Sequence, residues 1–114
     1  MDNTIKAKSY RFAVRIVKLC KYLQTDHKEY VLSRQLLRCG TSIGANVAES
    51  QQAQSRPDFI SKLNIALKEA AETEYWLHLL YETEYLTTLQ FDSIMKDCDE
   101  IKRLLVTIVK SSKE

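Results

Sequence analysis

The sequence predicts an all-α fold, an antiparallel up-down bundle of four helices that form one domain over residues 1–114. Apolar residues recur at steps of three and four through almost the whole chain, which is the spacing of one helix face. One proline and two glycines leave little material for turns, so the sequence favours few and long elements. No segment alternates apolar and polar residues as a strand does.

The first two helices are expected over about residues 4–24 and 28–54, with a polar turn at 25–27. Each helix carries one apolar stripe that can face a core. The stripes consist of Ala13, Ile16, Val17, Cys20 and Leu23 in the first helix and of Leu32, Leu36, Cys39, Ile43 and Val47 in the second.

The last two helices are expected over about residues 57–83 and 88–110. Pro57 suits the first helical position with Ser55 as its cap, and Thr87 or Thr88 can cap the fourth helix. The fourth helix has the cleanest apolar stripe of the chain, formed by Phe91, Met95, Cys98, Ile101, Leu105 and Ile108.

The third helix carries apolar side chains on two sides. Its main stripe includes Leu63, Leu67 and Leu77, whereas a second apolar edge consists of Ile65, Trp76 and Leu79. A helix that is apolar on two sides needs two surfaces to pack against. We therefore expect the second edge to be an interface between copies of the chain.

Charge is unevenly distributed along the chain, although the net charge is only +2. Residues 1–28 hold seven Lys/Arg and two Asp, and residues 58–100 hold three Lys and ten Asp/Glu. This asymmetry predicts complementary surfaces within the bundle or between subunits. The three widely spaced cysteines form no zinc or disulfide pattern and suit core positions in a reducing compartment. With no apolar run long enough to span a membrane, the sequence predicts a cytoplasmic protein.

Both glycines lie in the segment RCGTSIGANVAES, residues 38–50. A glycine inside a helix costs roughly 1 kcal/mol relative to alanine, so two of them require a compensating contact. The sequence favours close approach of another helix at Gly40 and Gly44, or a bend. A phosphate-binding loop is the alternative, but no strand precedes the segment and the GxxxxGK[ST] pattern is absent.

Polar residues at helical spacing in the second and third helices predict a structural network. A carboxylate buried without a partner costs several kcal/mol, so Arg38 is expected to pair with Glu72 or Glu74. Removing one partner of such a buried pair is expected to cost about 3–5 kcal/mol. Ser42 and Asn46 are expected to complete the hydrogen bonding. The predicted network consists of Arg38, Ser42, Asn46, Glu49, Glu72 and Glu74.

A basic stripe on the first helix is the candidate nucleic-acid-binding surface. It consists of Lys8, Arg11, Arg15 and Lys18, at steps of three and four, with Lys21 beside it. Such a stripe is either a solvated face, a surface that follows the phosphates of RNA or DNA, or a surface used in assembly. The sequence alone leaves these three interpretations open.

The sequence gives no support for catalysis, a cofactor or a metal site. Glu74, His78 and Glu82 lie on successive turns, but a two-metal bundle uses a Glu-x-x-His pair on each of two helices. Neither His27 nor His78 follows an Arg at the spacing used by helical ribonucleases, and no nucleophile is paired with a histidine. We expect a protein without enzyme activity.

The run RQLLRCGTSIGANVAES, residues 34–50, resembles the signature of the four helix bundle protein family, whose founding members are encoded in intervening sequences of bacterial 23S ribosomal RNA genes. Ile65-Ala66 and Glu72-Thr73-Glu74, followed by Leu77, resemble the later family motif. Order and spacing agree over about residues 8–110. Gly44 stands where the family usually has Pro, and Ser50 where it usually has Gly.

The resemblance implies a left-handed up-down bundle that assembles as a ring-like homopentamer, without an assigned enzyme activity. It also implies kinship with the accessory protein of diversity-generating retroelements, which binds a reverse transcriptase and nucleic acid. We therefore expect an oligomeric scaffold that binds RNA or DNA without sequence preference. The alternative is an adaptor that recruits a partner enzyme, such as a reverse transcriptase, and does not itself bind nucleic acid.

Overall fold

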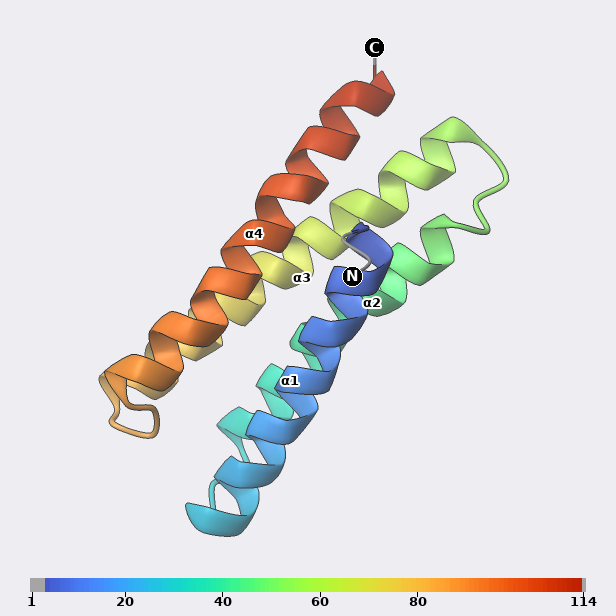
Figure 1. Ribbon diagram of the computed structural model, residues 1–114. Helices are drawn as coiled ribbons and strands as arrows, with labels where there is room; N and C mark the ends of the chain where they lie inside the picture. Colours follow the sequence, from blue (N-terminus) through green and yellow to red (C-terminus); the bar gives the residue numbers. More distant parts are fainter. Residues whose placement is uncertain (1–3, 114) are drawn as a thin grey trace.

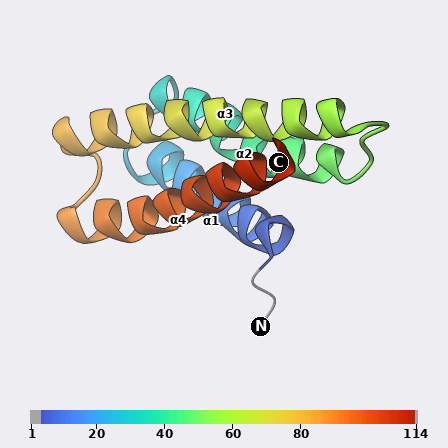
Figure 2. The same ribbon diagram turned by 90° about the horizontal axis from the view of Figure 1, so that it is seen from above.

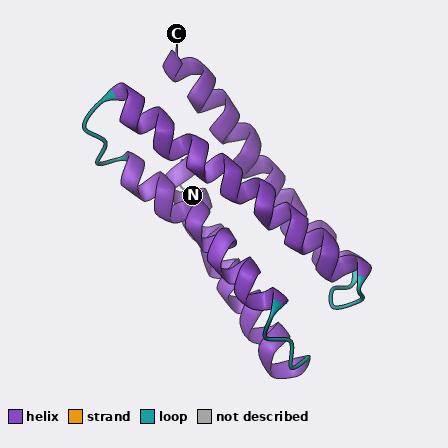
Figure 3. Cartoon of the chain, turned by 180° about the vertical axis from the view of Figure 1, so that it is seen from behind, coloured by secondary structure: helices purple, strands orange, loops and turns teal. Residues whose placement is uncertain are grey.

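A computed structural model describes residues 4–113, which form four helices: α1 (Ile5–Asp26), α2 (Leu32–Ser50), α3 (Arg56–Glu82) and α4 (Thr88–Lys113). No strand occurs within these residues, so the predicted all-α class is confirmed. Consecutive helices run in opposite directions (Figure 1), and three short loops join them (Figure 3). The chain measures 45 × 26 × 21 Å along its principal axes.

The helices pack in sequence order. α2 lies against both α1 and α3, α3 lies against α4, and α1 meets α4 only lightly. The α1–α2 and α3–α4 loops lie at one end of the molecule and the α2–α3 loop at the other (Figure 2). At that other end, the last turns of α4 extend past the start of α1 (Figure 1).

The predicted apolar stripes meet in one core. Its fully buried members include Phe12, Ile16, Leu36, Ile43, Leu63, Leu77, Ile101 and Leu105. The three cysteines are free and buried in this core, as predicted. Burial raises the pKa of Cys20 and of Cys98 to about 12, because an apolar interior disfavours the thiolate.

Side-chain caps fix the starts of the long helices. The Thr4 hydroxyl accepts a hydrogen bond from the amide of Ala7 at 3.1 Å, and Ser55 caps α3 as predicted, at 3.2 Å from the amide of Asp58. Of the two candidate caps of α4, Thr87 is the one used. Its hydroxyl accepts from the Gln90 amide at 3.1 Å, and the Gln90 side chain accepts from the Thr87 amide at 2.9 Å.

The second helix is shorter than the predicted 28–54, which is wrong at both ends. Lys28 adopts the left-handed backbone conformation with φ 54°, which separates it from the helix. The Glu29 carboxylate then accepts from the amides of Leu32 at 3.2 Å and Ser33 at 2.8 Å, so the helix starts after it. The backbone amides of residues 51–53 donate to carbonyl oxygens three residues earlier, which ends the α-helix.

The two glycines bring α1 and α2 together. A methyl group on Gly40 would lie 2.8 Å from Cγ2 of Ile16, and one on Gly44 would lie 3.0 Å from the backbone oxygen of Ser9. Neither glycine has positive φ, and α2 is continuous through both. The predicted close approach is therefore confirmed, and its cause is contact with α1.

Candidate nucleic-acid interface

Two cations of the basic stripe are paired within the subunit. Lys8 forms an ion pair with Glu100 of α4. Arg15 donates to the Asp97 carboxylate at 2.6 Å, and to the backbone oxygen and hydroxyl of Ser93 at 3.2 and 3.0 Å. These contacts bridge α1 and α4, which otherwise meet only lightly. Lys8 and Arg15 therefore contribute to holding the bundle together.

The other three cations of the stripe face solvent. Arg11, Lys18 and Lys21 are exposed, and none of them forms an ion pair within residues 4–113. Arg11 lines a small cleft of about 100 Å³ that is also lined by Asp97 and Glu100. The negative charge of these two carboxylates partly offsets the positive potential of Arg11. Lys18 lies at a groove of about 440 Å³ between α1 and α4 that carries no carboxylate. The stripe thus presents three cations to a ligand rather than five.

The groove beside Lys18 combines apolar and hydrogen-bonding groups. Besides Lys18 and Arg15, it is lined by Leu19, Tyr22, Leu89, Gln90, Ser93 and Ile94. The Tyr22 hydroxyl lies 3.0 Å from Nε2 of His27, and the two rings meet edge to face at 5.2 Å. These groups can contact sugar or base atoms next to a phosphate, but they form no base-specific pattern.

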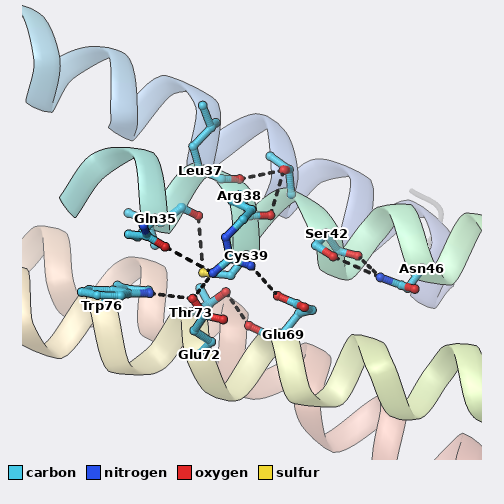
Figure 4. Close-up of polar contacts among 12 residues, drawn as sticks. Gln35, Leu37, Arg38, Cys39, Ser42, Asn46, Glu69, Glu72, Thr73 and Trp76 are labelled. Atoms are coloured by element: carbon cyan, nitrogen blue, oxygen red, sulfur yellow. Dashed lines mark hydrogen bonds and ion pairs between the residues drawn. The ribbon is translucent and has the colours of Figure 1, made fainter. Parts of the chain in front are cut away.

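The predicted polar network divides into separate contacts. Figure 4 shows Arg38 reaching from α2 to two carboxylates of α3, an ion pair with Glu72 and a longer contact to Glu69 at 3.6 Å. The indole of Trp76 donates to the same Glu72 carboxylate at 2.9 Å. The Arg38 side chain is 54 % exposed, so this pair lies at the surface. Sequence reasoning missed Glu69, although it lies one helical turn before Glu72.

Neither Ser42 nor Asn46 of the predicted network bonds to the Arg38 guanidinium. Asn46 donates instead to the hydroxyl and backbone oxygen of Ser42, at 3.1 and 2.9 Å, on the same helix (Figure 4). These residues therefore do not complete the Arg38 cluster, which corrects the prediction. Helical geometry explains the difference, because Asn46 lies two turns along α2 from Arg38.

The remaining two carboxylates have lysine partners. Glu49 pairs with Lys62 at 3.3 Å, and Glu74 pairs with Lys102 of α4 at 2.5 Å. The hydrogen bond from Lys102 to Glu74 raises the pKa of this lysine. Glu74 is thus paired across the α3–α4 contact. The sequence allowed Arg38 as its partner, but its partner is Lys102.

The predicted second apolar edge of α3 is partly exposed. Ile65 is exposed, and Trp76 and Leu79 are half-buried. Tyr75, which the sequence analysis omitted, is 60 % exposed, and its ring meets that of Trp76 edge to face at 5.0 Å. The edge therefore presents one exposed and one half-buried aromatic ring together with two aliphatic side chains.

Comparison with known proteins places the chain in a family. The family model described as 23S rRNA-intervening sequence protein matches residues 1–107. The chain belongs to this family. A similar solved structure is that of a protein with unknown function from the S23 ribosomal protein family of Bacteroides thetaiotaomicron. It is 62 % identical, with a TM-score of 0.93, and the alignment covers 94 % of this chain and 99 % of that one. A comparison with curated proteins finds no match.

The two positions at which this chain departs from the family signature both lie in α2. Gly44, which stands where the pattern has Pro, faces the backbone of Ser9. Ser50, which stands where the pattern has Gly, is buried, and its hydroxyl donates to the backbone oxygen of Val47 at 2.6 Å. Both departures are thus accommodated within a continuous α2.

Glu74 and His78 of α3 have separate partners and do not converge on one site. Glu74 is paired with Lys102, and the His78 ring lies at 5.0 Å from that of Phe91. Across residues 4–113, no three His, Cys, Asp or Glu residues form a group that could hold a metal ion. None of the four helices is long and apolar enough to cross a membrane.

Proposed function

We propose that this protein is a non-enzymatic scaffold that assembles as a ring-like homopentamer of left-handed bundles and binds RNA or DNA without sequence preference. The observation that supports binding is the exposure of Arg11, Lys18 and Lys21 on one helix, where none of them forms an ion pair with a carboxylate of residues 4–113. The exposed second edge of α3 supports assembly. The family resemblance supports the number of subunits and the hand of the bundle.

The three cations suit contact with a phosphate backbone. At 1.5 Å per residue, Arg11 and Lys18 are about 10 Å apart along α1, and Lys21 continues the line. Phosphate contacts position a nucleic acid but carry no sequence information. Three cations in one subunit give weak binding, whereas a ring presents them several times and gains affinity by avidity.

The first test replaces Arg11, Lys18 and Lys21 together by Gln. Retention of a single-stranded RNA of mixed sequence should weaken, and the slope of log affinity against log salt should fall by about 2 or more. The matched control replaces Lys8 and Arg15 by Gln. Because these two cations are bound to α4, the control should lower stability and leave most of the RNA binding intact.

The adaptor alternative is favoured by apolar groups at one end of the bundle. Tyr30 and Val31 in the α1–α2 loop and Leu89 at the start of α4 are exposed, and both loops lie at this end (Figure 2). An adaptor would dock a protein here and needs no phosphate contacts. Wild-type protein that is oligomeric but retains no RNA or DNA at about 50 mM salt would support the adaptor and contradict nucleic-acid binding.

A further inference from the structure

An apolar groove of about 590 Å³ runs between α1 and α2 on the outside of the bundle. It is lined by Lys6, Ala7, Tyr10, Ala13, Thr41, Gly44, Ala45 and Ala48. Small side chains form its floor, because Gly44 lets the two helices approach closely. Tyr10, at 70 % exposed, is its only large side chain besides Lys6. An apolar groove of this kind can bind one further helix by its apolar face.

The same chain carries a projecting apolar surface that this groove can hold. The second edge of α3 presents Tyr75 and Ile65 to solvent, with Trp76 and Leu79 half-buried beside them. The groove is lined mainly by small side chains, whereas the edge carries large apolar side chains that are exposed or half-buried. Because α2 separates α1 from α3, one copy of the chain cannot bring its own edge to its own groove.

Charge favours the same pairing. Among residues 4–113, Lys6 is the only charged residue that lines the groove, and α1 holds six Lys/Arg and one Asp, a net charge of +5. α3 holds three Lys/Arg and five Asp/Glu, a net charge of −2. It is the only net acidic helix within residues 4–113. Three of its five carboxylates are already paired with Arg38 or Lys102, so the complementarity that remains is that of an apolar edge on a net acidic helix with an apolar groove whose Lys6 forms no ion pair within residues 4–113.

We propose that the α1–α2 groove of one copy receives the outer edge of α3 from a second copy. This assignment rests on the self-assembly proposed above and names the surfaces that would make it. The two surfaces differ, so the contact is heterologous, and each copy uses one groove and one edge. Repetition of such a contact closes into a ring when the rotation between copies allows it.

This docking leaves the candidate phosphate contacts free. Successive residues of a helix are about 100° apart around its axis. Tyr10 and Ala13 point to the groove, whereas Arg11 and Lys18 are not among its lining residues. A single helix can thus hold a neighbour on one side and a nucleic acid on the other.

The test uses one variant on each surface. Ala45→Trp fills the floor of the groove at an exposed position, and Tyr75→Glu puts a charge on the edge of α3. Each should reduce the mass seen by light scattering from that of an oligomer to that of one chain, 13.2 kDa. The matched control is Val106→Glu on α4, where a 52 % exposed apolar residue lies on neither surface. It should stay oligomeric, and circular dichroism should show all three variants folded.

Mixing the two defective variants gives the sharper result. Ala45→Trp keeps an intact edge and Tyr75→Glu keeps an intact groove, so an equal mixture should form dimers of twice the single-chain mass and nothing larger. A mixture that remains monomeric would contradict the pairing of these two surfaces.

The other outcomes are also decisive. Wild-type protein of single-chain mass defeats the proposed self-assembly itself. An oligomeric wild type whose mass neither variant changes defeats only this assignment of surfaces. If Ala45→Trp keeps the wild-type mass but loses RNA retention, the groove binds nucleic acid and the inference is wrong. Ala45→Trp could instead keep both the wild-type mass and the RNA retention. If it then fails to bind an acidic amphipathic peptide that the wild type binds, the groove is a binding site for another protein and the inference is equally wrong.

Discussion

At the residue scale, the two glycines have a measurable role. In an exposed helix, replacing Gly by Ala stabilises by roughly 1 kcal/mol. At Gly40 the added methyl group would lie 2.8 Å from Cγ2 and 2.9 Å from Cγ1 of Ile16, which is itself fully buried. Both atoms are bonded to Cβ of Ile16, so turning the outer end of this side chain does not relieve the contact.

We therefore predict that Gly40→Ala destabilises the protein by about 1–3 kcal/mol despite its better helix propensity. Urea denaturation measures this difference. The control is Ile16→Ala, which costs stability itself but removes both clashing atoms. In that background Gly40→Ala should be neutral or stabilising. Equal losses in the two backgrounds would show that the contact with Ile16 is not the cause.

The sequence predicts that something approaches the glycines but not that Ile16 and Ser9 do so. Two glycines four residues apart in a helix indicate close packing, because each glycine destabilises the helix and a close contact compensates for that loss. Which face of α1 meets them depends on how the helices pack, and that information is not local. The same limit explains why Arg38 could be assigned a carboxylate but Ser42 and Asn46 were assigned wrongly.

At the element scale, periodicity fixes the existence of a helix better than its ends. All four helices follow the stripes read from the sequence, and the Ser55 cap is read correctly. The predicted start of α2 is wrong because Glu29, which could be part of a helix, instead lies in the preceding turn and caps α2. Lys28 in the left-handed conformation makes this possible, and a lysine gives no sequence signal for that conformation.

The contact between α3 and α4 gives a prediction about ion pairs. The Glu74 side chain is 23 % exposed and that of Lys102 is 34 % exposed, so water still reaches both. We predict that Glu74→Ala lowers the free energy of unfolding by about 1 kcal/mol, well below the 3–5 kcal/mol of a broken buried pair. A double-mutant cycle with Lys102→Ala should give a coupling of similar size. A loss of 3 kcal/mol or more would show that the pair is shielded from water.

At the scale of the whole molecule, the seam between α1 and α4 decides which cations are available. The sequence places five cations on α1 but cannot tell which of them face α4. Lys8 and Arg15 do so and are paired with Glu100 and Asp97, whereas Arg11 is exposed and lines the cleft beside these carboxylates without an ion pair within residues 4–113. The sequence therefore predicts where the candidate surface lies. The number of cations that remain available to a ligand follows only from the packing of α1 on α4.

The shared core links the stability of the whole bundle to alkaline pH. Burial raises the pKa of Cys20 in α1 and Cys98 in α4 from 9.0 to about 12, and raises that of Cys39 in α2 as well. Above pH 9 the unfolded chain loses thiol protons that the native protein keeps. The stability that Cys20 and Cys98 contribute is thus fully present below pH 9 and falls as the pH rises toward 12, by about 1.4 kcal/mol per pH unit for each of these two thiols.

We predict that unfolding in urea with a reductant becomes easier between pH 8 and pH 10, by about 1.4 kcal/mol for each of Cys20 and Cys98, and that Cys39 changes the stability in the same direction. Cys98→Ala should be less stable than the wild type at pH 8, because it removes a core side chain. Its further loss on going to pH 10 should be smaller than that of the wild type by about 1.4 kcal/mol, since one titrating group is gone. If both proteins lose the same amount, the alkaline sensitivity arises from other groups, and the Cys98 thiol ionises as readily in the folded chain as in the unfolded one.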